Sequence, residues 1–205
     1  MIDLLEEKSI SIDRIHKVFD EQQKNMLAVR NTDVNQRITK LKAILKYIDQ
    51  NTEKIQKALY SDFKKHPTEV LISEIMIVKG EINHLIKHLA EWAEPQQVST
   101  PMNMIGSSAW VQFESKGNCL IIAPWNYPFN LAIKPTVQAI AAGNTVILKP
   151  SELTPHTARL INEMITELFP ENEIAVFEGG ADLSTELLAL PFNHIFFTGS
   201  PNVGK

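Results

Sequence analysis

The chain has 205 residues, of which 44% are hydrophobic, and this is enough apolar material for one good core. Its formal charge of −4 argues against a nucleic-acid partner, and neither a secretory signal nor an apolar run of membrane-spanning length is expected. The single cysteine, Cys119, excludes an internal disulfide and fits a reducing compartment, so we expect a cytoplasmic protein.

Residues 1–96 have the apolar periodicity of helices. Asn51 or Thr52 is placed to cap a short helix that runs through Leu59. An amphipathic helix before it is predicted by apolar residues at steps of three and four, namely Val34, Ile38, Leu41, Leu45 and Ile48. A longer helix, ended by Pro95 and packed on a sheet, is predicted by Leu71, Ile75, Val78, Ile82, Leu85, Leu89 and Trp92.

Two histidines on this longer helix have the spacing of a zinc pair. His84 and His88 lie four residues apart and therefore share one helix face. No third ligand stands near them in the sequence, and both lie off the apolar stripe. We therefore expect solvated histidines and no metal site.

Residues 97–117 have the pattern of an exposed strand pair. Pro101 and Gly106 interrupt the segment, and residues 110–115 alternate apolar and polar side chains, as a half-exposed strand does. Exposed strands between packed units invite pairing with another subunit. We expect a β-arm here.

The most informative stretch follows, where an apolar strand ends at a polar amide. Residues 120–122 form the strand, and Pro124 and Pro128 stiffen the turn, which places Trp125 and Asn126 at the carboxyl end of the strand. Ligands bind at this end in open α/β sheets. The Asn126 amide has two N–H donors, which can stabilise an oxyanion without adding a charge. The alternative is an asparagine that satisfies the backbone of a turn.

A helix over 131–142 and a strand over 145–148 then complete a βαβ unit of about 30 residues. Its crossover is expected to be right-handed, so Lys149 and Glu152 follow a parallel strand beside the one that precedes Asn126. Lysine and glutamate both hydrogen-bond vicinal hydroxyls well, as a ribose requires. The alternative for these two residues is a surface ion pair.

The rest of the chain repeats the alternation of helix and strand. We expect helices over 155–169 and 182–190 and strands over 173–177 and 194–198, with a tight turn at Gly179 and Gly180. The last strand leads into a loop in which Gly199 and Gly204 let the backbone approach a phosphate. Residues 118–205 therefore predict an α/β fold with a Rossmann-like parallel sheet.

The same loop permits a second interpretation. Residues 199–205 match Gly-x-x-x-x-Gly-Lys, the beginning of a P-loop, after an apolar strand. A triphosphatase also needs a second metal-binding acidic strand, for which no residues follow, and a P-loop does not explain the segments around Asn126 and Lys149. A P-loop nucleotide-binding fragment remains the alternative.

Three motifs, in order, resemble the aldehyde dehydrogenase superfamily. They are Ala-Pro-Trp-Asn-Tyr-Pro-Phe-Asn at 123–130, Ala-Ala-Gly-Asn-Thr-Val-Ile-Leu-Lys-Pro-Ser-Glu at 141–152, and Phe-Phe-Thr-Gly-Ser at 196–200. The continuation at 127–130 is most similar to the class 3 branch. The similarity has consistent spacing from about residue 70 to residue 205, and it is looser before that.

The resemblance implies a role for each motif. Asn126 is the implied catalytic residue, as the donor to the oxyanion of an aldehyde substrate. Lys149 and Glu152 would bind the adenosine ribose, and Ser200 would donate to the pyrophosphate of NAD, with NADP also possible. The implied cofactor-binding set is Trp125, Lys149, Glu152, Gly179, Gly180, Gly199, Ser200 and Gly204. The arm at 97–117 is implied to join two subunits into a homodimer.

The resemblance also implies that important parts lie outside these residues. Family members are more than twice as long, and their catalytic cysteine and general-base glutamate match no position here. Cys119 begins a buried strand, where a thiol is inert. We therefore expect the N-terminal, cofactor-binding portion of an NAD(P)-dependent aldehyde dehydrogenase, an incomplete fold that is inactive alone. The alternative is a non-catalytic, truncated NAD-binding product.

Overall fold

The computed structural model describes the backbone of residues 2–201 and 204, and the side chains of residues 12–201 and 204. The α-helices are α1 (Ile2–Arg30), α2 (Val34–Gln50), α3 (Thr52–Phe63), α4 (Pro67–Val70), α5 (Met76–Ala93), α6 (Pro128–Ala141), α7 (Pro155–Leu168) and α8 (Ala181–Leu188). The strands are β1 (Gln96–Val98), β2 (Ala109–Val111), β3 (Asn118–Ile122), β4 (Thr145–Lys149), β5 (Ile174–Val176) and β6 (His194–Phe197). A π-helix, η1 (Leu71–Ile75), and a short 3-10 helix, η2 (Met102–Met104), complete the described elements.

The predicted parallel sheet is confirmed. Its strands lie in the order β5-β4-β3-β6, and Ile122 of β3 is paired with Lys149 of β4 on one side and with Phe197 of β6 on the other. This register brings the carboxyl ends of the three strands to one level of the sheet. Each strand ends within two residues of its predicted position.

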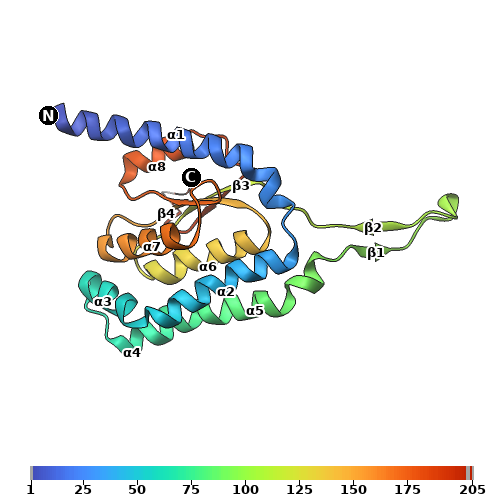
Figure 1. The fold of residues 1–205 in the computed structure, drawn as a ribbon, viewed down its shortest axis with the longest axis horizontal. Helices are drawn as coiled ribbons and strands as arrows, with labels where there is room; N and C mark the ends of the chain where they lie inside the picture. The colour runs from blue at the N-terminus through green and yellow to red at the C-terminus, as the bar shows by residue number, and fades with distance from the viewer. Residues whose placement is uncertain (1, 202–203, 205) are drawn as a thin grey trace.

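Helices cover both faces of the sheet, which explains why its strands are continuously apolar. Ile121, Val146 and Leu148 face a core formed with α2, α5, α6 and α7. Leu120 and Ile147 point to the opposite face, where α1 and α8 cover them. Figure 1 shows these layers, with α1 and α8 on one side of the sheet and α6, α7 and then α2 and α5 on the other.

The start of α6 and the cap of α3 differ from the prediction. α6 begins at Pro128, three residues early, because proline fits the first position of a helix, where no N–H is needed. Asn51 does occupy the N-cap position of α3, but it makes no side-chain cap. Its amide instead donates to the Tyr47 carbonyl at 2.9 Å, so the predicted cap was wrong.

The long helix over 71–92 is interrupted at its start by η1. A π-helix adds about one residue to a turn and so changes which positions face the core. Leu71, predicted in the stripe, is exposed, whereas Val70 and Glu74 are buried. Trp92 at the other end is also exposed. The stripe from Ile75 to Leu89 is buried as predicted, but α5 packs mainly on α2 and α6 and not on the sheet.

The predicted exposed strand pair is present in the arm. β1 and β2 pair antiparallel, and the structure has Trp110 and Phe113 largely exposed. Figure 1 shows the two strands projecting far from the helices, while at the base of the arm Glu114 forms an ion pair with Arg30 of α1. No helix in the described part of the chain is long and apolar enough to cross a bilayer.

Candidate active site

The loops that carry the predicted site residues leave the sheet at one edge. Backbone bonds hold the ends of the strands together here, from Ala123 N–H to the Lys149 carbonyl at 3.0 Å and from Thr198 N–H to the Ile122 carbonyl at 3.2 Å. The end of β5 is joined in the same way, because Phe177 N–H donates to the Leu148 carbonyl at 3.0 Å. The fold therefore provides the ligand-binding edge typical of α/β proteins.

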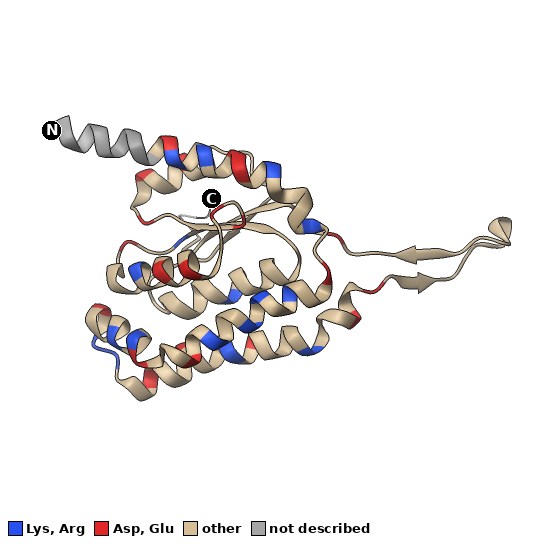
Figure 2. Cartoon of the chain, in the orientation of Figure 1, with Lys and Arg blue, Asp and Glu red and all other residues tan. Residues whose placement is uncertain are grey.

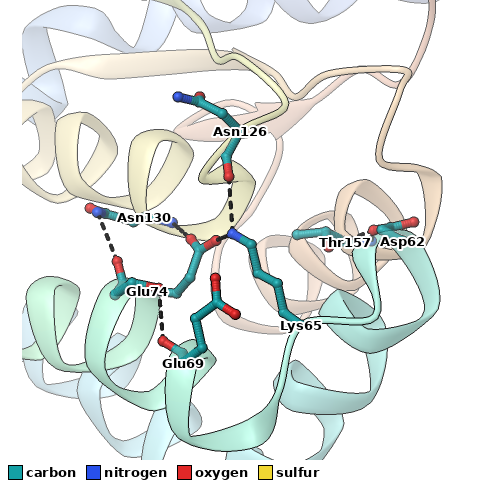
Figure 3. Close-up of polar contacts among 8 residues, drawn as sticks. Asp62, Lys65, Glu69, Glu74, Asn126, Asn130 and Thr157 are labelled. Atoms are coloured by element: carbon teal, nitrogen blue, oxygen red, sulfur yellow. Dashed lines mark hydrogen bonds and ion pairs between the residues drawn. The ribbon is translucent and has the colours of Figure 1, made fainter.

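Asn126 lies in the turn between β3 and α6, and its residue is exposed. Its main-chain carbonyl accepts a hydrogen bond from Lys65 Nζ at 2.9 Å. Its side-chain amide has no hydrogen-bond partner among the described residues, and Figure 3 shows it pointing away from Lys65. The amide is therefore free to donate, and it does not satisfy the backbone of a turn.

Trp125 precedes this amide and is 52% exposed. Its indole lies near Phe63 at the end of α3, with 6.2 Å between the ring centroids. The indole therefore forms part of the surface beside Asn126.

Lys149 and Glu152 form an ion pair at the end of β4. Lys149 Nζ lies 2.7 Å from Glu152 Oε2, and the exposed side-chain fractions are 4% and 45% respectively. The hydrogen bond from Lys149 lowers the pKa of the Glu152 carboxyl, which therefore stays ionised at neutral pH. The ion-pair alternative and the ribose-binding interpretation are compatible here, because the carboxylate is still accessible.

The glycines lie in the loops after β5 and β6. Gly180 is not part of a tight turn; its backbone is extended, and it forms the N-cap of α8, so that prediction was wrong. Gly199 has no room for a side chain, because a Cβ atom there would lie 2.3 Å from the Phe197 ring. Gly204 N–H donates to the Ser200 carbonyl at 3.1 Å, which closes the last described turn. Lys205, on which the P-loop alternative depends, lies outside the described residues.

The sequence analysis missed three residues around this edge. Lys65 and Glu74 form a buried ion pair at 2.8 Å beneath the Asn126 turn. Asp62 accepts hydrogen bonds from the first turn of α7, including one from Thr157 N–H at 2.9 Å. A charged residue inside the apolar stripe of 71–92 was the available signal for Glu74, whereas nothing in the sequence pairs Asp62 or Lys65 with a distant loop.

Cys119 is 3% exposed within β3. Burial raises the pKa of its thiol to about 11, so the residue is protonated at neutral pH. The predicted burial of Cys119 in the strand is confirmed, and a protonated, buried thiol is a poor nucleophile.

Comparison with known proteins identifies the fold and the relatives. A model of the aldehyde dehydrogenase family matches residues 6–205. The chain is 44% identical over 173 residues to 4,4'-diaponeurosporen-aldehyde dehydrogenase of Staphylococcus aureus, covering 84% of this chain and 38% of that protein. It is 40% identical over 169 residues to a mouse aldehyde dehydrogenase described as dimeric and NADP-preferring, covering 82% of this chain and 37% of that protein. The chain thus spans about two fifths of the length of these relatives.

Solved structures show the same similarity. A substrate-bound Staphylococcus aureus AldH superimposes with a TM-score of 0.90 at 40% identity, covering 93% of this chain and 42% of that one. The glyceraldehyde-3-phosphate dehydrogenase GapN of Methanocaldococcus jannaschii, complexed with NADP, superimposes with a TM-score of 0.79 at 21% identity, covering 95% and 43%. The second match shows the shared fold alone.

Proposed function

The chain belongs to the aldehyde dehydrogenase family, and we propose that it provides the cofactor-binding part of an NAD(P)-dependent enzyme that oxidises aldehydes to carboxylic acids. The observation that supports this most is the free Asn126 amide at the carboxyl end of β3, level with the ends of β4 and β6. Relatives that include family 3 members agree with a class 3-like assignment.

Asn126 has the chemistry needed for the addition step. When a thiolate adds to an aldehyde carbon, the carbonyl oxygen becomes an oxyanion, and a neutral N–H donor stabilises that charge. The thiolate must come from the remaining part of the family fold, because Cys119 is buried and protonated. Oxidation then leaves a thioester, from which water, activated by a glutamate of that remaining part, releases the acid. This chain alone is therefore proposed to be inactive.

The residues at the sheet edge fit a dinucleotide. Glu152 offers an accessible, ionised carboxylate for a ribose diol. Gly199 has no side chain, so a ligand can approach its backbone, whereas a Cβ atom there would collide with Phe197. We propose that Lys149 and Glu152 hold the adenosine ribose, and that the loop over 199–204, with Ser200, holds the pyrophosphate. Bound NAD(P) supplies a hydride acceptor.

Two further features belong to the same proposal. Trp125, Gly179 and Gly180 lie on loops at this edge and are assigned to the cofactor surface. The arm over 97–117 is proposed to join two copies into a homodimer. The family match includes the loop over 199–204, which favours a pyrophosphate loop over a P-loop.

The test uses the completed enzyme, meaning this chain joined to the remaining part of the fold that its relatives contain. Asn126→Ala should lower kcat for aldehyde oxidation about 100- to 1,000-fold, with the NAD dissociation constant nearly unchanged, because one oxyanion donor is lost. Asn162→Ala on α7 is the control and should leave kcat unchanged. Turnover within about threefold of the unmodified enzyme in Asn126→Ala would refute the oxyanion role, since removing such a donor costs far more than that.

A further inference from the structure

A buried ion pair lies directly beneath the Asn126 turn. Lys65 Nζ and Glu74 Oε1 are 2.8 Å apart, with exposed side-chain fractions of 10% and 0%. Glu74 is the only fully buried acid in the part of the chain whose side chains the structure describes. A buried ion pair seldom adds net stability, because removing two charges from water offsets their attraction. Stability alone therefore does not explain its presence.

Lys65 holds the main chain of the residue that carries the free amide. Its ammonium donates to the Asn126 carbonyl at 2.9 Å. It also lies 4.5 Å from the centre of the Tyr127 ring, a cation–π distance. One cation therefore contacts two consecutive residues of the turn, while the Asn126 side chain extends to the opposite side (Figure 3).

Glu74 holds the other end of the same turn. Its second carboxylate oxygen accepts from Asn130 N–H, the third residue of α6, at 2.8 Å. The N-cap residue of α6, Tyr127, makes no side-chain cap of its own. A carboxylate at a helix N-terminus satisfies a free N–H group and complements the helix dipole. The turn is therefore fixed at Asn126 by Lys65 and at Asn130 by Glu74.

Unusual backbone conformations flank both members of the pair. Lys64, the residue before Lys65, has φ of 60°, the only positive φ of a non-glycine residue in the described chain. Glu74 lies within the π-helix η1. The left-handed Lys64 is the C-cap of α3 and places Lys65 directly after that helix, whereas a π-helical turn is often found where a fold needs a particular geometry.

From these contacts we infer that Lys65 and Glu74 are positioning residues that hold the Asn126 turn so that its amide points at the developing oxyanion. The inference rests on the proposed function of Asn126. Neither residue touches the reacting atoms. They act through the main chain of Asn126 and the first turn of α6.

The experiment measures kcat, aldehyde KM and the NAD dissociation constant for Lys65→Met and Glu74→Gln in the completed enzyme. Lys65→Met should lower kcat about tenfold or more, because a small displacement of a catalytic group has a large effect on rate. Glu74→Gln keeps the size of the side chain and an acceptor for Asn130, so its loss of kcat should be smaller, about threefold to tenfold. In both variants KM and NAD affinity should stay within about twofold. If Lys65→Met does not fold, the same measurements on Glu74→Gln alone test the inference.

A double-mutant cycle distinguishes positioning from general stabilisation. In the Asn126→Ala background there is no amide left to aim, so Lys65→Met or Glu74→Gln should change kcat by less than about twofold. A loss of the same size in both backgrounds would mean that the pair only supports the fold, and would overturn the inference.

The matched control is Lys40→Met. Lys40 pairs with Glu173 at 2.6 Å, is 23% exposed, and lies at the amino end of the sheet, away from Asn126. It should leave kcat unchanged. If Asn126→Ala has a large effect but Lys65→Met and Glu74→Gln leave turnover unaltered, only the inference about the pair is overturned. Unaltered turnover in Asn126→Ala overturns the proposed function and this inference with it.

Discussion

Glu152 has two properties that bear on cofactor choice. Its side chain is 45% exposed at the end of β4, and the hydrogen bond from Lys149 keeps it ionised at neutral pH. An ionised carboxylate accepts hydrogen bonds from a 2′-hydroxyl but repels a 2′-phosphate. NAD should therefore be preferred over NADP, although rotation of the exposed Glu152 side chain would admit either.

Glu152→Ala in the completed enzyme should weaken NAD binding about tenfold, because one charge-assisted hydrogen bond is lost. It should strengthen NADP binding by a similar factor, because the repulsion is removed. Titration of each cofactor, followed by nicotinamide fluorescence or calorimetry, measures both constants. Glu163→Ala, which removes an exposed carboxylate on α7, should change neither. If Glu152→Ala gains nothing for NADP, the discrimination lies elsewhere.

Individual residues were predictable only where chemistry and chain position coincide. Asn126 and Lys149 each come within four residues of the end of a predicted apolar strand, so the sequence alone indicated their edge of the sheet. Lys65 is 61 residues away from Asn126 in the chain, and no local pattern joins them. Contacts of this kind depend on how helices dock, which periodicity does not specify.

The two helices that follow β3 and β4 begin in the same way. α6 and α7 each start with a proline after an N-cap residue whose side chain does not cap the helix. In each case a carboxylate from the N-terminal helical segment accepts a hydrogen bond from an N–H group of the first turn instead. Glu74 caps α6 in this way, and Asp62 caps α7. These two caps attach the helical layer to the functional edge of the sheet.

Asp62→Ala should destabilise the first turn of α7. The variant loses hydrogen bonds from His156 N–H at 3.1 Å and from the Thr157 N–H and hydroxyl at 2.9 and 2.7 Å. Loss of a helix cap costs about 1 to 2 kcal/mol, so amide exchange over residues 155–160 should become about tenfold faster. Hydrogen–deuterium exchange with mass spectrometry measures it. Asp49→Ala, which breaks a surface pair with Lys79 of 2.5 Å, is the control, and an equal effect there would contradict the capping role.

At the level of elements, the strands were predicted closely because their apolar runs are bounded by glycine, proline and asparagine. The π-helix was not, because the spacing from Leu71 onward continues smoothly into α5. The buried Glu74 fixes the local register by binding Lys65 and Asn130, and tertiary contacts therefore override the apolar periodicity.

Several apolar side chains of the described residues are uncovered, including those of β6 and of the arm. β6 lies at the edge of the described sheet, with Ile195 and Phe196 at least 40% exposed. In the arm, residues 96–113 contain no charged side chain, as Figure 2 shows. A two-stranded ribbon is only marginally stable in water by itself. An arm of this composition is therefore expected to be covered by another chain.

The arm should be the main contact between two copies of the completed enzyme. Ile105 and Phe113 are 84% and 67% exposed, and burying such side chains stabilises an interface by about 1.5 to 3 kcal/mol each. Replacing both with serine should therefore raise the dimer dissociation constant at least about a hundredfold, as measured by analytical ultracentrifugation over a dilution series. Leu27→Ser on α1, which changes a side chain 62% exposed outside the arm, should leave it unchanged. If the doubly substituted enzyme sediments as the unmodified one does at every concentration, the copies meet through another surface, and the uncovered arm must then have a different partner.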